Sequence, residues 1–312
     1  MRNTIGTSLI SWMAVAAACF SQPPARQPLP ASVDLDVFFE DAFTEALEGE
    51  RPDVTSRPQQ REGSNQSDGD ASPNRNTVQS EGDWARLISK TTLEDEVKAV
   101  KSTMDQTIST PGRFQSGGYK IARTEYTSAA VMFAIIAEFP DTVRWQDSAL
   151  NVRDALAKVA ANAKVGTIQV FNEARLRQAD LMDLLNGSRT SLPAGEPGPT
   201  QWQHVCDRSP LMLRLEVAAE NRLNQWTRSA AEIRENASSL VHEAEIVAAF
   251  AQILQNDQME DGQDEDYEAH CRQMQDAALQ LRQAVKDGDA AAVQAQHGRI
   301  RQSCSACHEI YR

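Results

Sequence analysis

Apolar residues recur at alternating steps of three and four through the last third of this chain. The clearest series lies between residues 229 and 255 and consists of Ile233, Ala237, Leu240, Ala244, Val247, Ala251 and Leu254. This spacing places every member on one face of an α-helix. Similar series run over residues 212–226, 267–285 and 290–311. Because each helix must bury its apolar face and short connections make neighbours antiparallel, residues 205–312 predict an antiparallel four-helix bundle.

Residues 83–188 show the same helical pattern, so the fold class expected for the ordered chain is all-α. The best apolar series there consists of Trp145, Ala149, Val152, Leu156, Val159 and Ala163. Residues 189–204 are rich in Gly and Pro and are interpreted as a linker between two bundles. A chain of 312 residues is long enough for two such domains.

The N-terminal residues 1–18 have the pattern of an export signal. Arg2 precedes an uncharged, mostly apolar run that ends in small residues up to Ala18. The sequence therefore predicts a periplasmic or otherwise exported protein. Cleavage, lipid attachment at Cys19 and an uncleaved anchor all stay open, and such an anchor is the only membrane contact expected. Residues 19–82 are rich in Pro, Gln and Ser and predict a disordered tether.

The charge of the chain limits its partners. Its formal net charge is −13 and its pI is near 4.9. Nucleic acids and anionic lipid surfaces repel such a chain, so neither is expected as a partner. A partner protein with a basic surface is favoured instead.

The strongest motif is Cys304-Ser305-Ala306-Cys307-His308 near the C-terminus. Positions i, i+3 and i+4 of a helix share one face, so two thiols and one imidazole can meet the same flat cofactor. Each thiol can add across a vinyl group of haem, and the imidazole can bind the iron. The sequence predicts one haem c, attached through thioethers to Cys304 and Cys307, with His308 as an iron ligand. Residues 83–188 contain neither Cys nor His, so that bundle is expected to be free of haem.

Other roles for these two cysteines are a disulfide between them, a zinc site or a thioredoxin-like redox pair. A redox pair expects a β-α-β context, which the helical pattern lacks. A zinc site expects two more ligands nearby. Haem attachment is therefore the favoured interpretation.

The C-terminal segment, residues 286–312, resembles the last helix of the cytochrome c-prime family. The resemblance rests on the motif above and on Tyr311-Arg312 directly after it, and it is plausible over about residues 205–312. It implies a four-helix bundle with haem at the C-terminal end. It also implies that His308 is the proximal iron ligand and that Arg312 lies near the haem. It does not extend to the first bundle or the tether.

Met212 is the candidate for the other face of the haem. The start of the first helix and the end of the fourth lie at the same end of an antiparallel bundle, so Met212 is expected level with His308. Its thioether can bind iron, although Met212 can equally be a core residue. Ser209 and Pro210 predict the helix start, which leaves Arg208 just outside it.

The family resemblance bears on the same position. Low-spin relatives carry Arg-x-x-x-Met in the first helix, where Met binds iron and Arg lies near a haem propionate. Arg208 and Met212 fit that spacing. High-spin relatives have an apolar residue there and leave the iron open.

These observations predict an exported electron carrier without enzymatic activity, which serves a redox partner protein. The alternative is a five-coordinate haem protein that binds nitric oxide or carbon monoxide. A peroxidase would need distal acid and base groups that the sequence does not place. Relatives often form homodimers through their first two helices, and the haem-free bundle could substitute for that contact.

The remaining histidines and cysteines have weaker assignments. His297 lies on an interior series but about 16 Å from His308 along the helix axis, so it is expected to pack beside the haem or in the core. His242 is expected to be solvated or hydrogen-bonded. Cys206 and Cys271 could pair with each other, or Cys271 could be a small buried thiol.

Overall fold

The structure is a computed structural model, and it describes residues 84–189 and 191–311. These residues belong to one compact unit, residues 73–312. The described part is helical and contains no strand, which confirms the all-α prediction. The predicted signal peptide (1–18), the predicted tether (19–82) and Arg312 lie outside the described residues.

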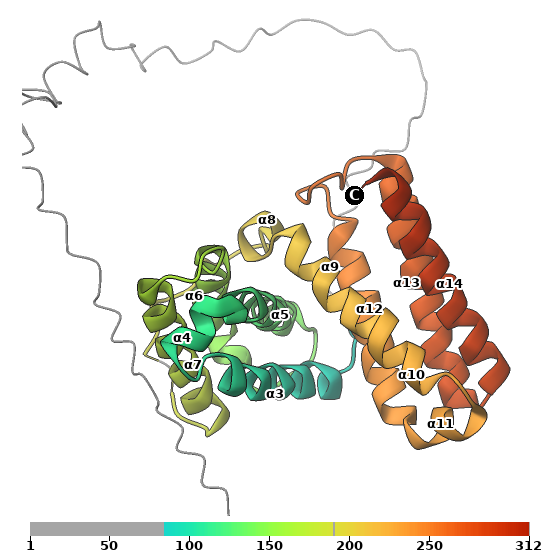
Figure 1. The fold of residues 1–312 in the computed structure, drawn as a ribbon, viewed down its shortest axis with the longest axis horizontal. Coiled ribbons are helices and arrows are strands. Elements are labelled where there is room, and N and C mark those ends of the chain that lie inside the picture. Colours follow the sequence, from blue (N-terminus) through green and yellow to red (C-terminus); the bar gives the residue numbers. More distant parts are fainter. Residues whose placement is uncertain (1–83, 190, 312) are drawn as a thin grey trace, which may run out of the picture. The chain divides into compact units, whose positions relative to one another are not determined.

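The C-terminal bundle has the four expected helices (Figure 1). The first is α9 (Arg208–Glu216), continued by the π-helical turn η4 (Val217–Leu223) and α10 (Asn224–Trp226). The second consists of α11 (Ala230–Glu235) and α12 (Ala237–Leu254), and the last two are α13 (Glu265–Asp287) and α14 (Ala290–Ile310). Neighbouring helices pack together as α9 with α12, α12 with α13, and α13 with α14.

The short turn between α13 and α14 explains why these two helices are antiparallel neighbours. Gly288 ends α13 with a left-handed backbone (φ 72°), which a residue without a Cβ adopts at no steric cost. Asp289 follows as the N-cap of α14, and its side chain accepts a hydrogen bond of 2.9 Å from the Ala292 amide. A short connection between these two helices agrees with the antiparallel bundle predicted from the sequence.

The predicted start of the first helix was wrong. The helix begins at Arg208, with Asp207 at the N-cap position, and Pro210 is its third residue. Proline is tolerated there because the first amides of a helix have no intrahelical acceptor to lose. Arg208 therefore belongs to the first turn of α9 rather than to the segment before it.

The second helix is interrupted at Asn236, where the sequence predicts one continuous series. Both the backbone amide and the side-chain amide of Asn236 donate to the Glu232 carbonyl, each at 2.9 Å. The first of these bonds is a regular helical one. The helix is interrupted because the backbone of Asn236 leaves helical angles (φ −104°, ψ 20°), which separates α11 from α12.

The N-terminal half is helical, as its sequence pattern predicts. Its four longer helices are α3 (Lys90–Thr107), α5 (Tyr119–Glu138), α6 (Ala149–Asn162) and α7 (Ile168–Leu185). Short segments complete it: α2 (Trp84–Leu87), α4 (Pro111–Arg113), η2 (Phe114–Gly118), η3 (Gln146–Ser148) and α8 (Trp202–Val205). Every residue of α5 from Tyr126 to Ile136 is buried, so this helix forms the centre of the half.

The two halves pack against each other within the compact unit. Helix α9 contacts α5, and α12 contacts α2 and α3. As a result, every residue of α12 from Glu243 to Ala251 is buried, although the sequence pattern predicts a helix with one buried face. The predicted boundary at residues 189–204 lies inside this unit, and the division into two domains stays a prediction.

Candidate haem site

Four chain segments meet at one end of the C-terminal bundle. At the start of α9, Arg208 forms an ion pair with Asp261 in the loop after α12. At the end of α14, the Tyr311 hydroxyl donates to the carboxylate of Asp264, the N-cap of α13, at 2.6 Å. The rings of Tyr311 and Tyr267 pack edge to face with centroids 5.2 Å apart. The start of the first helix and the end of the fourth therefore share one end, as the bundle topology predicts.

The motif occupies the last turns of α14 at this end. Cys307 is buried, Cys304 is half-buried and His308 is exposed. Both cysteines are free thiols, so no disulfide joins Cys304 to Cys307 in the structure. Within the described part of the chain, no hydrogen bond or ion pair engages the His308 imidazole, which leaves both ring nitrogens available.

The two thiols face sulfur and apolar side chains of α13. The Cys304 Sγ lies 3.8 Å from the Met274 Sδ. Burial raises the pKa of Cys304 to about 11 and that of Cys271 to about 12, and the nearby thiols add to both shifts. Burial also raises the pKa of Cys307, which the charge of Arg208 partly opposes. All three side chains are therefore neutral thiols near pH 7.

Tyr267 places a polar atom without a partner beside these thiols. The residue is fully buried, and its hydroxyl, which lies near the Arg208 guanidinium and the Cys271 thiol, makes no hydrogen bond of normal distance and angle to any described residue. Burial raises the pKa of Tyr267, with a further contribution from Cys271 and an opposing one from Arg208. Buried hydroxyls without a partner are uncommon in folded chains. Tyr267 is the first residue of the apolar series at residues 267–285, and the spacing of that series indicates burial without indicating whether a phenol hydroxyl has a partner.

The residues at this end fit a covalently bound haem. They provide two free thiols three positions apart, an unengaged imidazole and a buried hydroxyl that the chain itself leaves unsatisfied. Within the described residues, no three His, Cys, Asp or Glu side chains are arranged to hold a metal ion directly, so the zinc alternative gains no support. Haem needs fewer protein ligands, because its ring supplies four of them.

The structure places Arg208 in the first turn of α9, at the motif end of the bundle. Its guanidinium forms ion pairs with Glu260 at 3.0 Å and with Asp261, and it lies 6.0 Å from the centre of the Tyr267 ring. Met212, one turn further along α9, is partly buried and packs against the core. Iron ligation by Met212 and propionate binding by Arg208 stay predictions.

His297 belongs to the core, which is one of its two expected positions. Its Nε2 lies 3.0 Å from the Ala219 carbonyl oxygen and its Nδ1 lies 3.1 Å from the Thr227 hydroxyl. Ala219 belongs to the π-helical turn η4. With both nitrogens engaged, His297 links α14 to the first helix.

The other histidines and cysteines are placed as follows. The His242 Nε2 lies 2.9 Å from a Glu96 carboxylate oxygen. Of the two expected states of His242, solvated or hydrogen-bonded, the structure shows the second. The Nδ1 of His270 is buried without a partner in the described chain. Cys206 and Cys271 are both free thiols, so the pairing left open by the sequence is not formed.

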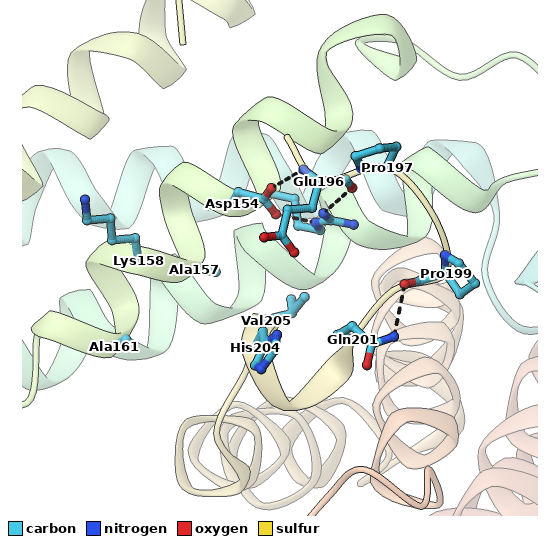
Figure 2. A pocket seen from close by; sticks show the side chains of 11 residues that line it. Asp154, Ala157, Lys158, Ala161, Glu196, Pro197, Pro199, Gln201, His204 and Val205 are labelled. Atoms are coloured by element: carbon cyan, nitrogen blue, oxygen red, sulfur yellow. Dashed lines mark hydrogen bonds and ion pairs between the residues drawn. The ribbon is translucent and has the colours of Figure 1, made fainter. Parts of the chain in front are cut away.

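Two cavities lie away from the motif. The first, of about 470 Å³, is bounded by α6, residues 196–201 and α8 (Figure 2). Its polar walls bond to one another, since the Asp154 carboxylate accepts from the Glu196 amide at 2.8 Å and Arg153 donates to the Glu196 carbonyl at 3.0 Å. The second, of about 380 Å³, lies between α3, α12 and the end of α13. Neither is lined by the motif residues.

In the part of the chain that the structure describes, no helix is both long and apolar enough to cross a bilayer.

Comparison with known proteins finds one match. No curated protein and no solved structure matches the chain. Residues 262–312 match the family model described as Cytochrome C'. The matched segment contains α13, α14 and the motif, and it leaves out Arg208 and Met212. The match supports a relationship to this family at the C-terminus, and it implies a c-type haem protein with a covalently bound haem.

Proposed function

We propose that this chain is an exported c-type cytochrome that carries one haem and transfers electrons without turning over a substrate. The observation that carries the proposal is the coincidence of the motif with the family match at residues 262–312. The free thiols of Cys304 and Cys307 and the unengaged imidazole of His308 support it. Members of this family are typically exported, which agrees with the signal predicted at residues 1–18.

Each residue of the site has a proposed role. Cys304 and Cys307 hold one edge of the ring through thioethers, and His308 is the proximal ligand. Met212 is the sixth ligand, and a Met/His pair raises the reduction potential of haem. Arg208 and Arg312 place positive charge near the carboxylates of the ring. When bound, haem supplies one-electron exchange.

The net charge of the chain and the packing of α9 and α12 against the haem-free half support proposals about which proteins the chain binds. A net charge of −13 favours a redox partner with a basic surface. Helices α9 and α12 pack against α5, α2 and α3, so we propose that the haem-free half takes the place of a second copy. A solution mass of one chain is expected, and a stable dimer would contradict this.

The test of the proposed function is haem analysis followed by a comparison of Met212→Leu with Met104→Leu. Leu keeps the volume of Met and removes the sulfur, and Met104 is a buried methionine in the haem-free half. Pyridine haemochrome analysis is expected to find one haem with two thioethers. The unmutated protein is expected to be low-spin, Met212→Leu high-spin, and Met104→Leu low-spin.

Two results would contradict the proposal at different levels. Colourless protein from a host able to attach haem would overturn the haem assignment. A haem-loaded but high-spin unmutated protein would overturn Met212 ligation, and rapid binding of carbon monoxide to its reduced form would favour the gas-binding alternative.

A further inference from the structure

Arg214 of α9 is the centre of a buried charge cluster between the two halves. The guanidinium donates to Glu96 of α3 through Nε at 2.8 Å and Nη2 at 3.0 Å. It also donates to Glu243 of α12 through Nη1 at 2.8 Å and Nη2 at 3.3 Å. All three side chains are at most 5% exposed. Arg214 of α9 therefore forms a bidentate ion pair with one carboxylate from each half.

A second layer completes this cluster. His242 contacts the outer oxygen of Glu96 at 2.9 Å, and Arg222 of η4 forms an ion pair with Glu243. Each carboxylate oxygen and each guanidinium nitrogen of the central three residues thus has a partner. A planar guanidinium meets two carboxylates in this way only at a defined orientation, so the cluster fixes the rotation and the register of α9.

Met212 lies between the two fixed points of α9. Arg208 is tied to Glu260 and Asp261 at the start of the helix, and Arg214 is tied to Glu96 and Glu243 near its end. The regular helix ends at Glu216 and passes directly into the π-helical turn. Since a rotation of α9 would turn the Met212 side chain away from its present direction, the Arg214 cluster controls where that thioether points.

We propose that the haem-free half has a role at the haem: Glu96, acting through Arg214, positions α9 so that Met212 can bind the iron. Glu96 is a positioning residue in this scheme and does not touch the cofactor. The inference rests on the proposed function, because it assumes that Met212 is the sixth ligand. It gives residues 83–188, which hold no haem, a part in setting the properties of the haem.

The test compares Glu96→Gln with Glu245→Gln in the full-length, haem-loaded protein. Glu245 of α12 is the matched control, because it is 2% exposed and also crosses between the halves, where it accepts from Ser89 at 2.7 Å and Thr92 at 2.6 Å. Its polar partners are Ser89, Thr92 and Arg282, and none of these belongs to α9. Both variants are expected to keep one haem per chain, so that the spectra are compared at equal haem content.

Glu96→Gln is expected to populate a high-spin form and to lower the midpoint potential, whereas Glu245→Gln leaves both unchanged. If the Met212-free form rises from about 1% to 10%, the apparent affinity of the reduced protein for carbon monoxide rises about tenfold. Arg214→Lys keeps the charge and loses the fork, so it is expected to shift the spectrum in the same direction. This second variant decides the matter if Glu96→Gln does not fold.

Failure of the inference is distinct from failure of the proposed function. A low-spin unmutated protein whose spectrum and potential are unaltered in Glu96→Gln and Arg214→Lys overturns the inference alone. An equal change in Glu245→Gln overturns it too, because any loosening between the halves would then suffice. A colourless or high-spin unmutated protein overturns the proposed function, or its Met212 ligation, and the inference with it.

Discussion

The Arg214 cluster and the motif end of the bundle are both buried and polar, but they differ in completeness. Around Arg214, every polar atom of the two carboxylates and the guanidinium has a partner. At the motif end, the Tyr267 hydroxyl, the His270 Nδ1 and the Gln258 Oε1 have none among the described residues. Because an unpaired buried polar atom costs free energy, a chain completes such groups where it can.

In one of these regions the chain alone satisfies all the buried hydrogen-bonding groups, and in the other it does not. The Arg214 cluster closes on itself and holds helices together. Among the described residues, the motif end leaves three buried polar atoms without a hydrogen-bond partner beside two free thiols and an unengaged imidazole. Five further atoms of this kind lie between residues 123 and 200, so it is the thiols and the imidazole that make the motif end the region for another molecule to complete.

The largest expected effect comes from breaking the complete cluster. Arg214→Ala leaves Glu96 and Glu243 buried without their main partner, and such a loss typically costs about 3–5 kcal/mol in the free energy of unfolding. Arg299→Ala, on the exposed side of α14, is the control and is expected to change stability by less than about 0.5 kcal/mol. Urea unfolding measures both. A loss near that of the control would show that the cluster is not what holds α9.

A smaller effect is expected from Glu125 of α5, whose carboxyl lies near the same cluster. Burial and the negative charge of Glu96 raise the pKa of Glu125 to about 7, against the opposing charges of Arg214 and Arg222. The folded chain therefore binds more protons than the unfolded chain between pH 4.5 and 7, so this group makes stability fall as pH rises through that window. The total is at most ~3 kcal/mol.

Glu125→Gln removes the titrating group and is expected to abolish this fall. The variant and the unmutated protein should be equally stable near pH 4.5, and the variant should be the more stable above pH 7. Urea unfolding across this range is the measurement. Curves that stay parallel from pH 4.5 to 8 would show that Glu125 does not titrate there.

The smallest effect is expected at Tyr267, and it tests directly whether the motif end contains an unsatisfied hydroxyl. Tyr267→Phe removes the unpaired hydroxyl and is expected to raise the stability of the haem-free chain by about 1 kcal/mol. Tyr126→Phe is the matched control: Tyr126 is equally buried, but its hydroxyl donates to the Ala174 carbonyl at 2.5 Å, so its loss is expected to lower stability by about 1 kcal/mol.

In the haem-loaded protein, the gain from Tyr267→Phe is expected to vanish or to reverse. Unfolding of the two forms in parallel distinguishes an unsatisfied group that a cofactor completes from one that is merely tolerated. The same gain with and without haem would remove the contrast drawn between the two regions.

Local patterns in the sequence predicted the helices and the motif well. Series of apolar residues predicted α6 and the four helices of the C-terminal bundle, because each is long and strongly periodic. The motif was visible because its three groups lie within five residues. The start of α9 was missed because Pro210 is compatible with either the first or the third position of a helix.

What the sequence could not show depends on contacts between distant residues. Arg214 and Glu96 are 118 positions apart, and each lies in a helix where a charged residue normally faces water. Only the packing of α9 against α3 and α12 reveals that both are buried. The role of Tyr267 was missed for a related reason, because a position in an apolar series indicates burial but does not indicate whether a hydroxyl has a hydrogen-bond partner.

The bonds of His297 have a consequence for the proton it carries. The Ala219 carbonyl can only accept a hydrogen bond, so the neutral imidazole must carry its hydrogen on Nε2. Nδ1 is then an acceptor for the Thr227 hydroxyl. The Leu223 carbonyl, 2.8 Å from the Thr227 oxygen, competes with Nδ1 for the single hydrogen of that hydroxyl. Burial lowers the pKa of His297, with the Ala219 bond opposing, so a second hydrogen arrives only in acid. It would sit on Nδ1, give Thr227 a donor of its own, and release the hydroxyl to Leu223. Because folding lowers the pKa of His297, the unfolded chain takes up this proton more readily, so acidification weakens the attachment of the terminal helix even though the protonated ring completes the bonds of Thr227.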